Sequence, residues 1–323
     1  MTFRVGVTAD LKTASGEPCF NRAAFDELKA NPEIEWEWLP DCDHISADVM
    51  ARYDALHVNL PLVGADAVAG DDLRVKLIAR NGVGFDTVDV AALAANGVAV
   101  TNTPFAIRRP VAVAALSLIF ALASKLPIKD QLVRSQRWND RVEHMGIGLS
   151  GRTLGLIGAG GIGQELASLA APFFAKVIAA DPFVAEADMA GAQKRELPEL
   201  LAEADFVVVC CMLNDDTHHL MNAEAFAKMK PESLFFNVGR GPIHDEAALI
   251  EALKSGHLGG AGLDVTEMEP IAPDSPLLTM ENTIITAHAL CWTDECFEDI
   301  ARTALRSIVD VSLGRQPAHL VAP

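Results

Sequence analysis

Short runs of β-branched and other apolar residues alternate with amphipathic stretches from one end of this chain to the other. Strands that alternate with helices in this way are typical of an α/β fold, in which helices cover parallel sheets. The runs fall into two series, each long enough to form a sheet of its own. The early series comprises residues 3–8, 34–39, 54–59, 75–80 and 97–102, and the later one comprises residues 153–158, 176–181, 205–211, 233–238, 261–265 and 282–287. The pattern therefore predicts two doubly wound parallel-sheet domains.

Helical stretches lie between these runs. Residues 245–256 are a clear example, with Asp245 at the start and Gly256 at the stop. The last helix, over residues 294–314, follows the later series, and its periodicity does not show which sheet it covers. The longest apolar run, from Val111 to Ala123, has 13 residues. Because a membrane span needs about 20 residues, we expect a buried helix there.

Composition narrows the classes of function. The 323 residues fit two domains of ordinary size, and half of them are hydrophobic, which is ample for packed cores. The net charge of −18 argues against nucleic acid and anionic membrane as partners, because both attract a basic surface. The N-terminus lacks the apolar run of a signal peptide, and the six cysteines show no C-x-x-C pairing and no metal-like cluster with histidine. We therefore expect a cytoplasmic protein without a metal, with reduced thiols, two of which (Cys210 and Cys211) lie in a buried strand.

The later series opens with a glycine-rich turn, GAGGIG, at residues 158–163. An apolar strand leads into it and a helix rich in Ala and Leu follows, which is the setting of a dinucleotide-binding turn. Gly158 permits the tight turn, Gly160 lets the backbone approach a pyrophosphate, and Gly163 lets the helix pack on the strand. The phosphates would bind free N–H groups at the helix N-terminus. A purely structural turn followed by a chance aspartate is the alternative.

Asp181 ends the second strand of this series, 18 residues after Gly163 and close to the offset of about 20 expected for an acid that binds ribose. A carboxylate there accepts hydrogen bonds from the ribose hydroxyls and repels a 2′-phosphate, and residues 182–188 contain no Lys or Arg. The sequence therefore predicts NAD rather than NADP. The predicted cofactor site also includes two further residues of the turn and three residues at strand ends: Gly161, Ile162, Cys211, Val238 and Gly239.

Three later segments carry groups suited to chemistry on a carbonyl. Arg240 follows one strand, Asp264, Glu267 and Glu269 follow the next, and His288 ends a third. A nicotinamide enzyme needs a cation to hold its substrate and an acid or base to move a proton. Because the carboxyl ends of parallel strands form one crevice, we expect all three segments on the cofactor side. Each has a plain alternative: the arginine could cap a helix, a glutamate before proline could begin a turn, and the histidine could be a buried hydrogen-bonding group.

The motifs GAGGIG, Asp181, NVGRG, LDVTEMEP and TAHALCWT, in this order, resemble the D-isomer-specific 2-hydroxyacid dehydrogenase family, which includes phosphoglycerate dehydrogenase and glyoxylate/hydroxypyruvate reductases. Residues 79–104 are similar to the substrate loop of that family. The resemblance implies that Arg240 binds and polarises the substrate, that His288 is the acid/base, and that Glu269 favours the protonated imidazole. It also implies a contact of Asp264 with NAD and a substrate-binding loop made of Gly82, Val83 and Gly84.

The resemblance further implies a layout for the whole chain. A Rossmann NAD-binding domain over residues 102–289 would be inserted into a flavodoxin-like substrate domain made of residues 1–101 and 290–323. The last helix would return to the substrate domain, and the cleft would lie between the two domains. Such enzymes are usually homodimers, joined through the region of the long apolar helix and the segment that contains Trp138.

The sequence departs from the family pattern at several positions. Ala287 stands where Pro usually precedes the histidine, Gly239 replaces a more usual Ala or Ser, and Met212 replaces a typical Pro. None of these changes removes a catalytic group. Trp292 could form a wall of the substrate pocket or pack between the domains, and we favour packing.

The largest departure is the segment 107–113, Ile-Arg-Arg-Pro-Val-Ala-Val, where the family commonly has small polar residues and a V-A-E signature. Pro110 would lie in the first turn of the apolar helix, where a missing N–H costs nothing. Arg108 and Arg109 could be solvated or form salt bridges between the domains. Alternatively, Arg108 faces the cleft as a second substrate-binding cation beside Arg240, which would favour substrates with an additional anionic group.

We therefore expect an NAD-dependent enzyme that interconverts a 2-oxoacid and a D-2-hydroxyacid. Oxidation of phosphite is an alternative on the same fold, whereas formate-type enzymes lack a Glu paired with the His, so Glu269 argues against them. An NAD(H)-sensing transcriptional corepressor is an alternative from another class. The fold does not select one substrate among the many that the family uses.

Overall fold

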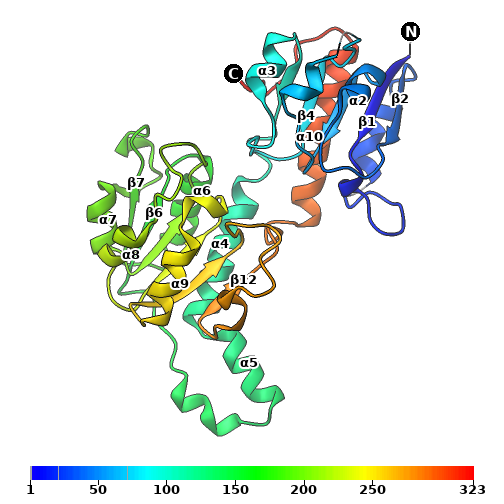
Figure 1. The fold of residues 1–323 in the computed structure, drawn as a ribbon. Helices are drawn as coiled ribbons and strands as arrows, with labels where there is room; N and C mark the ends of the chain where they lie inside the picture. The colour runs from blue at the N-terminus through cyan, green and yellow to red at the C-terminus, as the bar shows by residue number, and fades with distance from the viewer. Residues whose placement is uncertain (1, 21, 71) are drawn as a thin grey trace. The chain divides into compact units, whose positions relative to one another are not determined.

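Two compact units make up the chain, and a computed structural model describes its residues 2–20, 22–70 and 72–323 (Figure 1). The first unit comprises Met1–Ile107 and Trp292–Pro323, and the second comprises Arg108–Cys291. The first division lies six residues after the boundary expected at residue 101, and the second lies two residues after the boundary expected at residue 289. The segment after residue 101 stays with the first unit because the N–H of Asn102 donates to the carbonyl of His319 at 3.2 Å.

A five-stranded parallel sheet forms the centre of the first unit. The strand order β2-β1-β3-β4-β5 is that of a flavodoxin-like sheet, as predicted. Its strands are β1 (Phe3–Val7), β2 (Ile34–Trp38), β3 (Ala55–Val58), β4 (Leu77–Arg80) and β5 (Ala99–Thr101). Because every pair is parallel, the loops that follow β3, β4 and β5 lie along one edge of the sheet.

Helices cover both faces of this sheet, because alternate residues of its buried strands point to opposite sides. Ala55 and Leu77 contribute to one core, and Leu56 and Ile78 contribute to the other. The first core packs on the 3-10 helices η1 (Ala9–Leu11) and η2 (Arg22–Phe25) and on α1 (Asp26–Lys29) and α10 (Asp294–Ser312). The second packs on α2 (Ala47–Arg52), η3 (Ala65–Val68) and α3 (Val90–Ala95). The last helix, which periodicity could not assign, thus belongs to the first unit.

A seven-stranded parallel sheet forms the centre of the second unit, in the order β12-β11-β10-β9-β6-β7-β8. This is the strand order of a Rossmann sheet with one more strand, β12, at its edge. Its strands are β6 (Thr153–Ile157), β7 (Lys176–Ala180), β8 (Gln193–Lys194), β9 (Phe206–Val209), β10 (Ser233–Asn237), β11 (Leu258–Leu263) and β12 (Thr283–Ile285). All eleven strands predicted from the sequence are present, and the two-residue β8 was not predicted.

Two layers of helices cover this second sheet. On one face α4 (Arg108–Ala123) packs along α6 (Gly161–Ala170), and on the other lie α7 (Leu197–Glu203), α8 (Ala223–Lys228) and α9 (Glu246–Lys254). A Cβ on Gly262 of β11 would lie 3.2 Å from the Cβ of Leu118, so a glycine lets α4 approach the sheet closely. The apolar run is therefore a buried helix, as predicted, with Pro110 in its first turn. The loops of this unit include the 3-10 helices η5 (Glu186–Asp188), η6 (Gly241–Ile243) and η7 (Pro276–Thr279).

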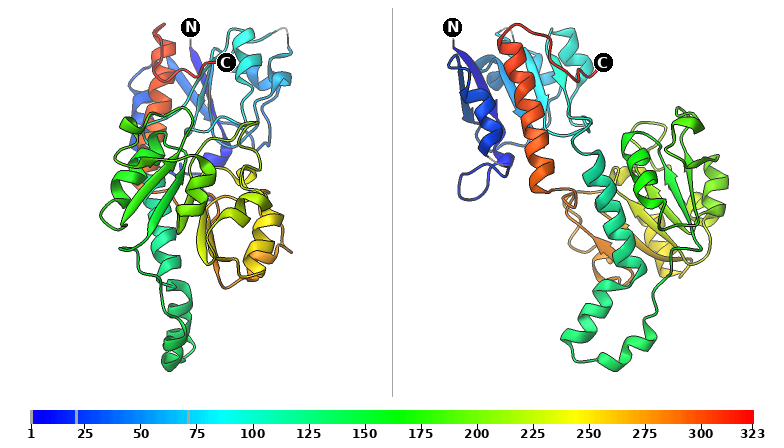
Figure 2. Two further views of the ribbon diagram at one scale, coloured as in Figure 1. Left: turned by 90° about the vertical axis from the view of Figure 1, so that its left-hand side faces the viewer. Right: turned by 180° about the vertical axis from the view of Figure 1, so that it is seen from behind.

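An arm made of α5 (Leu126–Arg134) and the 3-10 helix η4 (Trp138–Glu143) projects beyond the sheet of the second unit (Figure 2). The arm exposes large apolar side chains, namely Leu126, Val133, Trp138 and Val142. Within the described ranges, no single helix has the length and apolar character needed to cross a membrane. The helices α4 and α5 have this length and apolar character only when they are taken together, and the chain bends by 56° at the break between them.

Candidate active site

The glycine-rich turn joins β6 to α6, and the protein's own backbone requires two of its glycines. Gly158 has a φ of 102°, and a Cβ there would lie 2.7 Å from the backbone nitrogen of Cys211. A Cβ on Gly163 would collide with the carbonyl oxygen of Gly158. These contacts agree with the tight turn and the close helix packing expected of Gly158 and Gly163.

Gly160 differs, because a Cβ on it would meet no protein atom within 4 Å. Protein packing therefore does not require a glycine at this position, and the backbone there is open to a ligand. The next residue, Gly161, begins α6, and the first N–H groups of a helix have no partner within that helix. A diphosphate fits these features, because N–H groups and the helix dipole both stabilise negative charge. The turn can thus hold a dinucleotide.

Asp181 follows β7 and supports this turn. Its Oδ2 accepts the N–H of Ala159 at 2.8 Å, and its Oδ1 accepts the N–H groups of Phe183 and Val184 at 2.9 and 3.2 Å. The carboxylate therefore lies beside the glycine turn, where a ribose-binding acid is expected. Its hydrogen bonds to backbone N–H groups also hold the conformation of the glycine-rich turn and of the segment after β7.

Cys211 and Gly239, which follow β9 and β10, lie next to each other at the same edge. A Cβ on Gly239 would be 2.9 Å from the carbonyl oxygen of Cys211. The Sγ of Cys210 donates to the carbonyl of Gly158 at 3.1 Å. Burial raises the pKa of Cys211 to about 11 and also raises the pKa of Cys210, so both thiols remain protonated. These cysteines therefore line the edge as neutral thiols.

Arg240 lies on a loop that Asn237, the last residue of β10, holds in place. Nδ2 of Asn237 donates to the carbonyl of Arg240 and to Nδ1 of His244, both at 2.9 Å, and its Oδ1 accepts the N–H of Gly239 at 2.9 Å. Burial lowers the pKa of His244 to about 4, so its ring is neutral and Nδ1 can accept. One asparagine therefore fixes both sides of the turn that carries the arginine.

The loop of Arg240 passes directly against the loop that carries Glu269. A Cβ on Gly241 would collide with the carbonyl of Thr266, so no side chain fits at this crossing. Nη1 of Arg240 donates to the carbonyl of Gly239 at 2.8 Å. Backbone contact therefore sets the position of the arginine loop relative to the glutamate loop.

Glu269 and His288 form a hydrogen-bonded pair. Oε2 of Glu269 lies 2.8 Å from Nδ1 of His288, and Oε1 accepts the N–H of Thr266 at 3.2 Å. Burial alone would raise the pKa of Glu269. The hydrogen bond and charge of His288, the N–H of Thr266 and the charge of Arg240 outweigh burial and hold that pKa below its ordinary value. The imidazole side chain is 40% exposed, so it can still reach a ligand.

Asp264 holds the backbone around His288. Its Oδ1 accepts the hydroxyl of Thr286 at 2.5 Å and the N–H groups of Ala289 and Leu290 at 3.2 and 3.1 Å, and its carbonyl accepts the N–H of His288 at 2.8 Å. His288 has a φ of 51°, a left-handed conformation that is costly for a residue with a Cβ. These hydrogen bonds hold the strained backbone, so Asp264 positions the histidine. The contact of Asp264 with NAD stays a prediction.

The predicted substrate loop follows β4 in the first unit. Gly82 has a φ of 121°, and a Cβ on it would lie 2.5 Å from Nη1 of Arg80. Its carbonyl accepts the N–H of Thr103 at 2.9 Å, and the carbonyl of Val83 accepts Nδ2 of Asn102 at 2.9 Å. The peptide planes that lead to Gly84 are therefore held in fixed directions.

A buried polar network supports this loop. Oδ1 of Asn81 lies 3.0 Å from Nε2 of His57, and Nδ2 of Asn81 donates to Oδ1 of Asn59 at 3.1 Å. Burial lowers the pKa of His57 to about 4, so this ring is neutral as well. Its Nδ1 is buried and has no hydrogen-bond partner among the described residues.

The two adjacent arginines of the second unit have different surroundings. Arg109 forms an ion pair with Glu165 of α6 at 2.8 Å. The side chain of Arg108 lies against Gly161, with Cζ 2.7 Å from the position that a Cβ would take there.

In the first unit, the ring of Trp292 packs on that of Phe297, with centroids 4.6 Å apart.

Four residues that support the site were not predicted from the sequence, namely Asn237, His244, Asn81 and His57. The asparagines did carry a signal, since each directly follows or ends a buried strand just before a glycine-containing loop. Asparagine at such a place commonly hydrogen-bonds the backbone of the turn that follows. The histidines carried no such signal, because the partner of His57 comes from the end of another strand and that of His244 is set by how the loop between Asn237 and His244 folds back.

Comparison with known proteins identifies the family. Residues 116–289 match the family model of the D-isomer specific 2-hydroxyacid dehydrogenase NAD binding domain. The match spans more than half of the chain, from α4 to the segment of His288. The chain belongs to the D-isomer-specific 2-hydroxyacid dehydrogenase family. The second unit is therefore the NAD-binding domain of a dehydrogenase that interconverts 2-oxo and 2-hydroxy acids, which confirms the resemblance seen in the sequence.

Similar proteins agree with this assignment of the dehydrogenase. Glyoxylate/hydroxypyruvate reductase B of Enterobacter sp. (strain 638) is 36% identical over 230 residues, which cover 69% of this chain and 70% of that protein. Glyoxylate reductase of Korarchaeum cryptofilum (strain OPF8) is 34% identical over 305 residues, which cover 92% and 87%. The crystal structure of D-lactate dehydrogenase from Aquifex aeolicus, complexed with NAD and lactic acid, has a TM-score of 0.86 at 25% identity and covers 99% of each chain.

Proposed function

We propose that this dehydrogenase interconverts a small 2-oxoacid and the D-2-hydroxyacid with NAD(H), using Arg240, Glu269 and His288. The observation that carries the proposal is the hydrogen bond of 2.8 Å between Glu269 and His288. The loop of Glu269 lies against the loop of Arg240 at Gly241, where no side chain fits. A cation, an imidazole and a carboxylate are the groups that reduction of a carbonyl needs. The names of the relatives, glyoxylate and hydroxypyruvate reductases, support a small substrate.

Each of the three side chains has a distinct part in this reaction. NADH, when bound, supplies a hydride. Arg240 binds the substrate carboxylate with its planar guanidinium and draws electron density from the 2-oxo group. His288 gives the proton on Nε2 to the oxygen that becomes the hydroxyl and takes it back in the oxidation. Because Nδ1 is bonded to Glu269, Nε2 is the nitrogen left for the substrate, and the carboxylate stabilises the protonated ring.

We further infer that the loop of Gly82, Val83 and Gly84 binds the substrate carboxylate through the backbone N–H groups of Val83 and Gly84. The fixed carbonyls of Gly82 and Val83 support this role, because a held peptide plane presents its N–H in one direction. Gly82→Ala, which strains a φ of 121°, should then raise KM for the 2-oxoacid while the affinity for NADH stays unchanged.

A steady-state assay of NADH consumption with mono- and dianionic 2-oxoacids tests the proposed function. We expect rapid turnover with glyoxylate or hydroxypyruvate. We expect His288→Ala to lose turnover with NADH affinity retained, and Arg240→Ala to lose both substrate affinity and turnover. Binding of NADH without reduction of any 2-oxoacid would instead favour an NAD(H)-sensing corepressor, and NAD-dependent oxidation of phosphite would favour an anion dehydrogenase.

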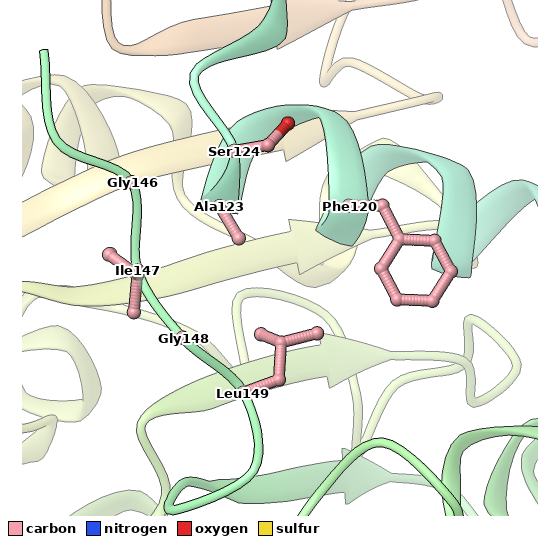
Figure 3. Close-up of a pocket in the computed structure, with 7 residues that line it drawn as sticks. All are labelled: Phe120, Ala123, Ser124, Gly146, Ile147, Gly148 and Leu149. Atoms are coloured by element: carbon pink, nitrogen blue, oxygen red, sulfur yellow. The ribbon is translucent and has the colours of Figure 1, made fainter.

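We also propose a homodimer joined through α4 and the arm. Trp138 and Val142 of the arm are 61% and 69% exposed, and exposed apolar surface of this kind is typical of protein interfaces. A shallow groove of about 370 Å³ lies at the end of α4, lined by Phe120, Ala123 and Ser124 and by residues 146–149 (Figure 3). Light scattering should give twice the chain mass of 34.5 kDa, and Val142→Asp should give the mass of one chain.

We propose a cytoplasmic location as well, supported by the six free cysteines, since thiols stay reduced in that compartment. Cell fractionation with activity as the readout tests it, and recovery of the protein outside the cytoplasmic fraction would contradict it.

A further inference from the structure

The arginine that begins α4 lies against the glycine-rich turn of the NAD-binding domain. Cζ and Cδ of Arg108 are 2.7 and 2.9 Å from the position that a Cβ on Gly161 would take, and Nε is closer still. Gly161 is the first residue of α6. The arginine therefore fills the space that a side chain at position 161 would need, directly beside the N-terminus of α6.

The charges at the start of α4 oppose the usual preference of a helix. Arg108 and Arg109 are its first two residues, and its first turn contains no acidic residue, although the helix dipole favours negative charge at an N-terminus. Arg109 is balanced by Glu165 of α6, 2.8 Å away. The side chain of Arg108 brings its charge to the N-terminus of α6, a place that suits a bound anion.

Gly160 supplies an independent observation at the same place. A Cβ there would meet no protein atom within 4 Å, so there is open space next to the residue that Arg108 covers. The diphosphate of NAD carries two negative charges, and the chain has a net charge of −18. Local cations therefore matter for holding this cofactor. A guanidinium suits the task, because its planar fork can donate two parallel hydrogen bonds to phosphate oxygens.

We propose that Arg108 binds the diphosphate of NAD together with the N-terminus of α6. This inference rests on the binding of NAD by the second unit, and it assigns the arginine to the cofactor rather than to a second carboxylate of the substrate. Gly161 belongs to the same arrangement, because the absence of a Cβ leaves the arginine its place.

Equilibrium titrations with NADH, ADP-ribose and adenosine separate the diphosphate from the rest of the cofactor. Arg108→Ala should weaken binding of NADH and ADP-ribose by about tenfold or more and leave adenosine binding unchanged. The affinity of Arg108→Lys for NADH and ADP-ribose should lie between those of the wild type and Arg108→Ala, because an ammonium keeps the charge but cannot donate two parallel hydrogen bonds. Arg109→Ala is the matched control and should bind all three ligands as the wild type does, because Arg109 is engaged with Glu165.

Gly161→Ala displaces the arginine without removing it. It should weaken ADP-ribose binding in the wild-type background and have no further effect in the Arg108→Ala background, because both changes act on one contact. Additive losses in the double variant would overturn the inference.

Other outcomes separate this inference from the proposed function. Wild-type affinity of Arg108→Ala for ADP-ribose would overturn it, as would an equal loss of adenosine binding, which would show a merely structural effect. A rise in KM for dianionic 2-oxoacids alone would assign Arg108 to the substrate and would overturn it too. A wild-type protein that bound neither NADH nor ADP-ribose would overturn the proposed function itself.

Discussion

Nδ1 of His288 lies 2.8 Å from Oε2 of Glu269, and the pKa of this carboxyl lies below its ordinary value although burial alone would raise it. The carboxylate therefore stays ionised through the neutral range and is protonated only at more acidic pH. We predict that Glu269→Gln lowers kcat/KM for reduction by about tenfold to a hundredfold. We also predict that the acid limb of its pH profile flattens, because an amide has no carboxylate to protonate. Steady-state pH profiles measure both effects.

Glu267→Gln is a suitable control for this prediction. Glu267 is on the same loop, but its carboxylate is bonded to His219 at 2.7 Å rather than to His288. It should keep the wild-type pH profile. A Glu269→Gln profile that superimposed on that of the wild type would show that the pair does not assist the proton transfer.

Asn237 fixes the loop of Arg240 through three hydrogen bonds. Asn237→Ala releases them together, so we predict a rise in KM for the 2-oxoacid of about tenfold or more, with the affinity for NADH within about twofold of the wild type. Steady-state kinetics and an NADH titration make the comparison.

An asparagine that only caps a helix provides the matched control. Asn222 is the N-cap of α8 and accepts the N–H of Ala225 at 3.1 Å. Asn222→Ala should cost about 1 kcal/mol of stability and leave KM unchanged. If Asn237→Ala lowered the stability and left KM unchanged, as Asn222→Ala should, the position of the arginine loop would not depend on Asn237.

The sheets could be predicted from the sequence because buried parallel strands are nearly continuous apolar runs. Phe206–Val209 and Ala55–Val58 are fully buried along their length and were found within two residues of their ends. The strand Gln193–Lys194 was missed because its two polar residues carry no such signal. Domain boundaries shifted by a few residues because the ends of the linking segments are fixed by tertiary contacts, such as that of Asn102 with His319.

The residues of the candidate site also fall into those that a local sequence pattern predicts and those that only the folded chain brings together. The glycine turn and the groups at strand ends are local patterns, so Gly158, Arg240 and His288 could be located before the fold was known. The bond of Asn81 to His57 joins the ends of two separate strands, and that of Asn237 to His244 depends on how the intervening loop folds back, so neither could be predicted from a local pattern. The same holds for Arg108: its sequence neighbours indicate a helix start, but only the packing of α4 on α6 brings it to Gly161.

Asp181 is expected to make the enzyme select NADH over NADPH. A 2′-phosphate beside this carboxylate would be repelled, whereas ribose hydroxyls can donate to it. Asp181→Asn removes the charge and keeps one acceptor for the N–H groups that Asp181 now binds. We therefore predict that the NADH-to-NADPH ratio of kcat/KM falls by about tenfold or more. Asp188→Asn, at an exposed carboxylate further along the segment, should leave the ratio unchanged, and an unchanged ratio in Asp181→Asn would place the ribose elsewhere.

The buried ring of His57 should make the first unit less stable in acid. Burial lowers the pKa of His57 from its ordinary 6.5 to about 4, so between these values the unfolded chain binds a proton that the folded chain does not. The stability that depends on the neutral ring is therefore fully present above pH 6.5 and is lost as the pH falls toward 4. The full effect amounts to about 3 kcal/mol of unfolding free energy.

Denaturant unfolding at neutral pH and at about pH 5, followed by the fluorescence of Trp36 and Trp38 in β2 of the same unit, measures this dependence on His57. His57→Gln keeps a donor for Asn81 but has no ring to titrate, so its unfolding free energy should fall less between the two pH values. His44→Gln, at an exposed histidine of the first unit, should keep the wild-type dependence. Equal pH dependence in His57→Gln and the wild type would mean that protonation of another group destabilises this unit in acid, because removing the buried ring would then have changed nothing.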